Sequence, residues 1–461
     1  MTKMSNSLVA SDMAHSMHPY TNMRAHERDG PMIITRGEGV HVYDAAGKEY
    51  IEGMAGLWSV ALGFSEPRLR DAAMRQMEAL PYYHSFAHKA HEPAIRLAEK
   101  LAEMSPGDLN RVFFTNSGSE ANDTVVKMVW FMNNALGRPE KKKFLARNRG
   151  YHGITVASGS LTGLPSNHRD FDLPAIPVTH LTTPHHWKEG RDAEDEAAFT
   201  ARLLKEAEDT ILAEGPETIA AFIGEPVIGA GGVMTPPEGY WPGIAALCRK
   251  YDILLVSDEV INGFGRLGTT FGCERYDFVP DIMVTSKQLT SSYMPLAAIL
   301  VSDRVYDAIA DNTDRIGTFG HGFTGSGHPV ATAVGLENLA IMEERDLIGN
   351  AARLGPILQS GLRERLADNP IVGEVRGVGL IAGAELVADR AAKAAFEPKL
   401  AVPAQVSRFA QEAGLFCRPV YDTVCLCPPM IVTEDDIARI LDRYCGAFDR
   451  TADWAQAEGL V

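Results

Sequence analysis

Four apolar runs of this chain end on side chains that can do chemistry. AAFIGEPV delivers Glu225, ILLVSDEV delivers Asp258, DIMVTSK delivers Lys287, and RVFFTN leads into the stretch Ser117-Gly118-Ser119. In open α/β sheets the ligand site lies beyond the carboxyl ends of the strands. If these runs are neighbouring strands, the sequence predicts that all four groups meet at one site.

Lys287 and Asp258 are the candidate catalytic residues. A lysine that closes an apolar strand is either a surface residue, since lysine is rarely buried, or a desolvated amine. The desolvated amine has a lowered pKa and can attack a carbonyl to form a Schiff base. A buried Asp258 needs a partner, either a structural cap or ion pair, or a heteroaromatic nitrogen that the carboxylate keeps protonated.

The segment Ser117-Gly118-Ser119-Glu120 fits a capping box that opens a helix running to about Leu136. Backbone N–H groups and two hydroxyls at a helix N-terminus bind phosphate well, although a capped helix without a ligand is the common alternative. Tyr151 and His152 follow the apolar run KKFLARN, and an aromatic ring there could stack on a flat cofactor.

Two other patterns carry weaker interpretations. Residues 320–325 match G-x-G-x-x-G, but no apolar strand precedes them as a dinucleotide site requires, so a nicotinamide oxidoreductase is kept only as an alternative. His84, His88 and His91 have helix-like spacing without cysteine partners. We interpret them as surface or packed histidines and expect no metal site.

Composition excludes several partners. The 461 residues include 44 Lys and Arg against 60 Asp and Glu, and the resulting net charge of −16 argues against nucleic acid or an anionic membrane surface. No apolar run approaches the roughly 20 residues that span a bilayer. Six cysteines without a CxxC pair and a start that lacks a signal-peptide core lead us to expect a cytoplasmic protein with reduced thiols.

The elements that must position these residues alternate between helix and apolar strand up to about residue 302. This pattern predicts an α/β fold with a mainly parallel central sheet that is covered on both faces. Before it, residues 1–30 read as an arm and residues 32–53 as two strands around the turn at 44–47. After it, helices over 328–344 and 346–366 and further short strands predict a smaller α+β domain.

The motifs SGSEAND, YHG, EPV, SDEVINGFGR, SKQLTSSYMPLAA and FTGSGHP stand in this order along the chain. From about residue 20 to 450 the sequence resembles the class III pyridoxal-phosphate aminotransferases. It looks most like the ω-transaminases, which pass amino groups between amines or β-amino acids and pyruvate. The resemblance implies fold type I of the pyridoxal-phosphate transferases, pyridoxal 5′-phosphate as cofactor, and a homodimer with shared active sites, with dimer or tetramer left open.

The resemblance also implies roles for individual residues. Lys287 matches the Schiff-base lysine, Asp258 the partner of the pyridine nitrogen, and Thr324 the threonine that reaches the phosphate of the neighbouring subunit. The remaining cofactor positions are Ser117, Gly118 and Ser119 in the phosphate cup, Val260 and Tyr151 on the two ring faces, and His152 and Glu225 beside them. The substrate positions are Trp58, Phe86, Tyr151, Ala230 and Arg418, of which Arg418 matches an arginine that takes a carboxylate and is offset by Glu225 when empty.

Four residues depart from the family pattern. Gln288 and Ser292 stand where relatives have glycine, Asn262 stands where many have threonine or cysteine, and Ala230 is smaller than its usual counterpart. We expect the first three to flank the cofactor and Ala230 to widen the pocket. An aminomutase, racemase or decarboxylase on the same scaffold remains open as an alternative. The predicted domains are an N-terminal segment over 1–65, a large cofactor-binding domain over 66–328 and a small domain over 329–461.

Overall fold

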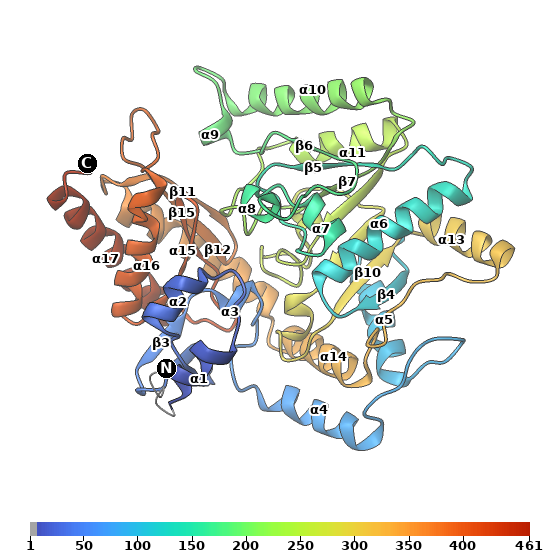
Figure 1. The fold of residues 1–461 in the computed structure, drawn as a ribbon, viewed down its shortest axis with the longest axis horizontal. Coiled ribbons are helices and arrows are strands. Elements are labelled where there is room, and N and C mark those ends of the chain that lie inside the picture. Colours follow the sequence, from blue (N-terminus) through green and yellow to red (C-terminus); the bar gives the residue numbers. More distant parts are fainter. Residues whose placement is uncertain (1–6) are drawn as a thin grey trace.

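A seven-stranded sheet forms the centre of the computed structural model, which describes residues 7–461 (Figure 1). Its order is β4-β10-β9-β8-β7-β5-β6. The strands are β4 (Arg111–Thr115), β5 (Lys143–Arg147), β6 (Val178–Leu181), β7 (Ile219–Gly224), β8 (Leu254–Asp258), β9 (Ile282–Thr285) and β10 (Ala297–Val301). The mainly parallel sheet is confirmed. The direction of β10 differs from the parallel prediction, because β10 runs antiparallel to both β4 and β9. Strand β6 was not predicted.

The near-continuous apolar runs are explained by burial on both faces of this sheet. In β8, Leu254 and Val256 belong to the same buried cluster as Val125 of α6, while Leu255 belongs to a second cluster with Ile244 of α11. All five strand residues of β8 are buried. Since successive side chains of a strand point to opposite faces, a sheet covered twice requires apolar residues at every position.

Helices cover the sheet and fill the rest of the chain. Helix α6 packs against strands β4, β7, β9 and β10, and α11 packs against β8. The helices are α1 (Leu8–His15), α2 (Met23–Asp29), α3 (Ala55–Trp58), α4 (Pro67–Ala79), α5 (Glu92–Met104), α6 (Gly118–Ala135), α7 (Val156–Leu161), α8 (Pro165–His168), α9 (His186–Glu189), α10 (Glu196–Glu214), α11 (Tyr240–Lys250), α12 (Gly272–Arg275), α13 (Asp303–Ile316), α14 (Pro329–Glu344), α15 (Leu347–Leu366), α16 (Val402–Glu412) and α17 (Glu434–Ala457), with 3₁₀ turns η1 (Lys287–Thr290) and η2 (Pro398–Leu400). None of these helices is both long and apolar enough to cross a membrane.

Two four-stranded sheets lie beside the large one, in the blue and red parts of Figure 1. One is β11 (Val372–Val378), β12 (Ile381–Leu386), β15 (Thr423–Leu426) and β14 (Arg418–Val420), in that order. The other is β1 (Ile34–Glu38), β2 (His41–Asp44), β3 (Glu49–Glu52) and β13 (Leu415–Phe416). The prediction of two strands over residues 32–53 was wrong, because three form there. Strand β3 pairs with β13, so both parts of the chain share this sheet, while the domain boundaries stay a prediction.

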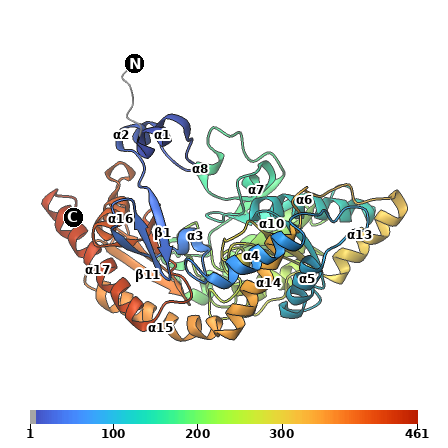
Figure 2. The same ribbon diagram turned by 90° about the horizontal axis from the view of Figure 1, so that it is seen from below.

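The N-terminal arm forms a helical hairpin from α1 and α2. It lies at the top of Figure 2, next to α8, and residues 1–6 of the predicted arm lie outside the described residues. Asn22 caps α2 by accepting a hydrogen bond from the Ala25 amide at 3.1 Å. The hairpin is held to α8 by the Asn167 amide, which donates to the Tyr20 hydroxyl at 2.6 Å.

Candidate active site

One cavity of about 690 Å³ opens at the carboxyl ends of the parallel strands and collects most of the predicted site residues. The predicted residues that line it are Trp58, Ser117, Gly118, Ser119, Tyr151, His152, Glu225, Ala230, Asp258, Val260, Lys287 and Arg418. Phe86 and Thr324 do not line it in this chain, and both are exposed. Strands β9, β8 and β7 are neighbours as predicted, whereas β4 is separated from β9 by the antiparallel β10; all four strands nevertheless run the same way.

Lys287 stands two residues beyond β9, at the first position of the 3₁₀ turn η1. Its φ of 44° lies in the left-handed region, where a lysine is strained and persists only when the surroundings enforce it. Its side chain is enclosed, and this burial lowers the pKa of the amine to about 8, against the opposing pull of the Asp258 and Glu225 carboxylates. The site therefore holds a partly neutral amine near neutral pH.

Asp258 ends β8 and is held by three hydrogen bonds. Its Oδ2 accepts from Asn122 Nδ2 at 2.9 Å and pairs with His152 Nδ1 at 2.8 Å, while Oδ1 accepts from the Val260 amide at 3.1 Å. Asn122 Nδ2 also donates to the His152 carbonyl at 2.7 Å. The carboxylate is thus fixed at the cavity wall in one orientation.

The N-terminus of α6 opens onto the same cavity. Ser117 caps it by accepting a hydrogen bond from the Glu120 amide at 3.2 Å, so the first half of the predicted capping box is present. The reciprocal half is not, because the Glu120 carboxylate accepts from the Asn116 amide at 2.8 Å instead of from Ser117. Gly118 and Ser119 begin the helix, where backbone N–H groups have no intrahelical partner and favour an anion.

Glu225 and Tyr151 are joined across the cavity floor. Glu225 accepts hydrogen bonds from the Tyr151 amide at 3.0 Å and the Gly229 amide at 2.9 Å, and burial raises its pKa. Burial also raises the pKa of the Tyr151 phenol, and the neighbouring Tyr20 adds to the effect. Among the described contacts Glu225 has no ion pair with Arg418, so its expected role toward that arginine stays a prediction.

Trp58 and Arg418 form the opposite wall. The Arg418 guanidinium carbon lies 5.0 Å from the centre of the Trp58 ring, and Lys287 Nζ lies 5.9 Å from the same centre. The chain around Trp58 is strained, with φ of 56° at Trp58 itself and 47° at Ala55. The Glu52 carboxylate holds this segment by accepting from the Met54 and Gly56 amides at 3.0 and 2.9 Å.

Some cavity residues were missed by the sequence reasoning. Asn122 is the clearest, because its contact with Asp258 crosses 136 residues of chain and has no local signal. Tyr20 and Tyr421 also line the cavity, from the N-terminal hairpin and from the segment after Arg418. For Tyr20, the sequence offered one hint, which is that it is an aromatic residue in a mostly polar segment.

The departures from the family pattern divide into two groups. Ser292 and Ala230 line the cavity. Gln288 and Asn262 do not, which corrects the expectation that they flank the cofactor. Gln288 donates to the Ile261 carbonyl at 2.9 Å, and Asn262 exchanges hydrogen bonds with the Val227 backbone at 3.2 and 3.0 Å. Gln288 and Asn262 are both buried and bind backbone groups of neighbouring segments.

The weaker sequence patterns have structural roles outside the cavity. The segment 320–325 follows helix α13, not a strand, so it does not have the strand-turn-helix form of a dinucleotide site. His91 caps α5 by accepting from the Ala94 amide at 3.4 Å, and His84 accepts from the Phe86 amide at 3.2 Å.

The cavity fits pyridoxal 5′-phosphate. It offers an amine for an aldehyde, a fixed carboxylate for a ring nitrogen and a helix N-terminus for a phosphate. The lack of a side chain at Gly118 lets the start of α6 pack closely on Val260, since a Cβ there would stand 3.1 Å from Val260 Cγ2. Buried Asn122 Oδ1 and His152 Nε2 have no hydrogen-bond partner in the described chain. Fold and site together define a pyridoxal-phosphate enzyme of fold type I.

Comparison with known proteins gives the family. A model described as Aminotransferase class-III matches residues 23–448. Gamma aminobutyrate transaminase 1, mitochondrial, from Solanum lycopersicum is 49% identical over 422 residues, which cover 91% of this chain and 82% of that protein. The chain therefore belongs to the class III aminotransferases and is a pyridoxal-phosphate-dependent transaminase.

Solved structures agree with this assignment. The omega transaminase from Pseudomonas jessenii in complex with PMP is 56% identical with a TM-score of 0.96, covering 98% of this chain and 99% of that chain. A transaminase with L-alanine is 55% identical with a TM-score of 0.90, covering 93% of this chain and 100% of that chain.

Proposed function

We propose that this transaminase takes the amino group of an amine or ω-amino acid and gives it to a keto acid such as pyruvate. The observation that carries the proposal is the shared wall at Trp58, which has the Lys287 amine and the Arg418 guanidinium on the same ring. The Lys287 amine can condense with a carbonyl carbon and can take a proton from the carbon that bears the substrate nitrogen, and the Arg418 guanidinium can bind a carboxylate. The L-alanine named with one related structure is the aminated form of pyruvate.

The residues divide the reaction between them. Lys287 Nζ removes the proton from the substrate carbon that carries nitrogen and returns a proton on the cofactor side, as base and then as acid; placed proton transfer contributes about 10²–10⁴-fold in rate. Bound pyridoxal phosphate supplies an aldehyde and a protonated ring that accepts an electron pair. Asp258 keeps that ring nitrogen protonated, and its bonds to Asn122 and His152 keep the carboxylate aimed.

Arg418 explains how one cavity accepts both a neutral amine and a keto acid. Without a carboxylate, the guanidinium rests on the Trp58 face, where cation–π contact offsets part of its lost hydration. With a keto acid, its planar fork binds both carboxylate oxygens. Arg418 lies on the short edge strand β14.

The proposal includes a homodimer with shared sites. Thr324 and Phe86 are exposed here and lie together, since Tyr82, four residues before Phe86, donates to the Thr324 carbonyl at 3.0 Å. This arrangement supports a face that completes the cavity of a second copy. The six cysteines are all unpaired and buried, which supports a cytoplasmic, reducing location.

The test of the proposal is Arg418→Ala. We expect KM for pyruvate to rise about 10–100-fold, because a charge-assisted hydrogen bond contributes roughly 1.5–3 kcal/mol, while KM for a neutral aldehyde acceptor changes little. Kinetics with one arylalkyl amine donor and the two acceptors measure this difference. Lys287→Ala is the control and should lose both reactions. Equal effects on both acceptors would contradict the role of Arg418, and carbon dioxide release or isomerisation without net amino transfer would contradict the function.

A further inference from the structure

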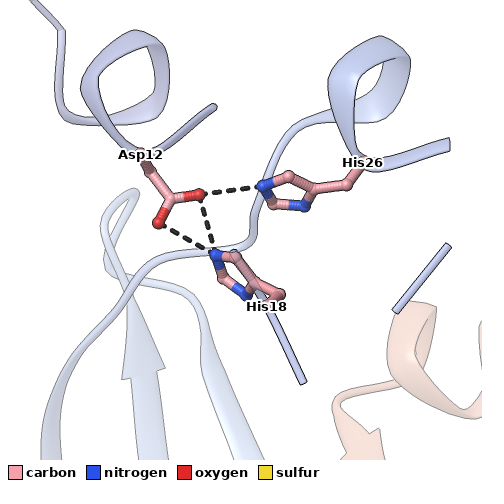
Figure 3. Close-up of side chains that lie close together, drawn as sticks. All are labelled: Asp12, His18 and His26. Atoms are coloured by element: carbon pink, nitrogen blue, oxygen red, sulfur yellow. Dashed lines mark hydrogen bonds and ion pairs between the residues drawn. The ribbon is translucent and has the colours of Figure 1, made fainter. Parts of the chain in front are cut away.

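Outside the catalytic cavity, the α1–α2 hairpin gathers three side chains whose ligand atoms converge (Figure 3). Asp12 comes from α1, His26 from α2 and His18 from the linker between them. His18 Nε2 lies 2.9 Å from each Asp12 carboxylate oxygen, and His26 Nε2 lies 2.9 Å from Oδ2. The two imidazole rings are 4.3 Å apart, so both ring nitrogens reach the same point from one side.

The chemistry of this cluster is that of a transition-metal site. Two imidazole nitrogens and one carboxylate oxygen are a common three-ligand set for zinc, with water in the fourth position. All three ligand atoms lie within 4.8 Å of one another.

A second cluster, with one histidine and two carboxylates, serves as a contrast. His185, Glu374 and Glu385 also lie close together, but the Arg376 guanidinium is 2.8 and 2.6 Å from the two carboxylates, and Lys188 Nζ is 2.8 Å from Glu385. The negative charges of Glu374 and Glu385 are therefore already compensated by the Arg376 and Lys188 side chains. Within the described residues, Asp12 forms ion pairs only with His18 and His26.

The hairpin is not remote from the reaction. Its linker carries Pro19 and Tyr20 to the rim of the catalytic cavity, between the ligands His18 and His26 along the chain. Tyr20 accepts a hydrogen bond from Asn167 of α8 at 2.6 Å, across the mouth of the site. An ion that joins α1, linker and α2 therefore fixes the segment that presents Tyr20.

We propose that Asp12, His18 and His26 bind one Zn²⁺ ion, which locks the α1–α2 hairpin over the mouth of the active site. In the metal-free hairpin each imidazole donates its Nε2 proton to the carboxylate. Metal binding moves that proton to Nδ1 of the neutral ring and replaces both hydrogen bonds by coordination at about 2.0–2.2 Å.

The test is zinc titration of the full-length holoenzyme, cleared of metal with EDTA, against a chromophoric chelator. We expect one saturable site per chain. His18→Asn and His26→Asn should each weaken binding at least ten-fold, since even changes behind the ligands of a metal site cost about 10–100-fold. His15→Asn is the matched control, because His15 is exposed on the same hairpin and outside the cluster, and it should bind as the native chain does.

Amide hydrogen exchange measures the lock separately. Added Zn²⁺ should slow exchange over residues 8–29 in the native chain and in His15→Asn, and not in His18→Asn; Mg²⁺, which prefers oxygen ligands, should have no effect. Zinc binding that is absent, or equally tight in the cluster variants, would overturn the site. Binding without slower exchange in the hairpin would overturn the lock.

Discussion

At the scale of single residues, two side chains of the active site stand on strained backbone. Lys287 and Trp58 both have backbone angles in the left-handed region, and the Trp58 side chain is buried. Such conformations cost of order 1–3 kcal/mol each and persist when the surrounding structure over-determines them. The strain turns the Lys287 amine and the Trp58 ring toward the same space.

The lowered pKa of Lys287 gives a prediction about pH. Condensation with an aldehyde needs the neutral amine, and burial lowers the pKa from 10.5 to about 8. Capture of pyridoxal phosphate by the cofactor-free protein should therefore speed up about ten-fold per pH unit below 8 and level off above 9. Stopped-flow absorbance of the covalent adduct measures this rate.

The same shift fixes the sign of a stability change. The folded chain binds the Lys287 proton more weakly than the unfolded chain, so the cofactor-free protein gains stability from this residue as pH rises from 8 to 10.5. Lys287→Ala is the control and should lack both the adduct and this gain. A capture rate that is flat from pH 6 to 9 would contradict a buried, shifted amine.

Lys287, Asp258 and Glu225 could be located from the sequence because each closes an apolar strand. Asn122 could not, since its side chain is defined by a partner 136 residues away that only the folded sheet brings near. The same holds for Asp12, His18 and His26. Their spacing matches no local metal motif, and they meet only because two short helices fold back on each other.

At the scale of elements, the apolar runs predicted the strands well but not their directions. Strand β10 is as apolar as its neighbours and is buried at all five positions, so its composition is that of a parallel strand. Its direction is set by the short connection from β9 through η1, which leaves no room for a crossover helix. Over residues 34–52 two strands were predicted and three form. Gly39 turns the chain tightly at a positive φ of 55°, so what was read as one strand is split into β1 and β2.

Helix α17 offers a prediction at this scale. Thr433 and Asp436 form a reciprocal capping box, in which Asp436 Oδ2 accepts from the Thr433 amide at 2.9 Å and Thr433 Oγ1 accepts from the Asp436 amide at 3.2 Å. The helix buries one face against α15 and α16, so its start is coupled to the small-domain core. Thr433→Ala should lower the free energy of unfolding by about 1 kcal/mol.

Urea unfolding followed by circular dichroism checks this value. Thr433→Ser keeps the hydroxyl and serves as the control, with an unfolding midpoint close to that of the native chain. An unchanged midpoint in Thr433→Ala would show that packing of α17 alone sets its N-terminus.

At the scale of the whole molecule, the overall composition of the chain does not describe its local sites. The net charge of −16 is a property of the whole chain, yet the cavity is built around Lys287, Arg418 and a helix N-terminus. One surface also departs from the average. Tyr82, Tyr83 and Phe86 are each at least 41% exposed and follow one another in the segment between α4 and α5. Exposed apolar clusters of this kind commonly mark protein interfaces.

This surface carries the last prediction, which concerns the proposed homodimer. Phe86 packs over Gly322, where a Cβ would stand 2.8 Å from its ring, and Tyr82 bonds to the Thr324 carbonyl, so one face presents the two predicted site residues that this chain's own cavity lacks. Phe86→Asp places a charge that association would have to desolvate. Light scattering after size exclusion should give twice the chain mass for the native protein and the single mass for Phe86→Asp at micromolar concentration. Leu212→Asp, at an exposed apolar position on α10, should stay dimeric. A native chain that elutes as a monomer with full activity would refute the shared site, because Thr324 and Phe86 would then have no cavity to complete.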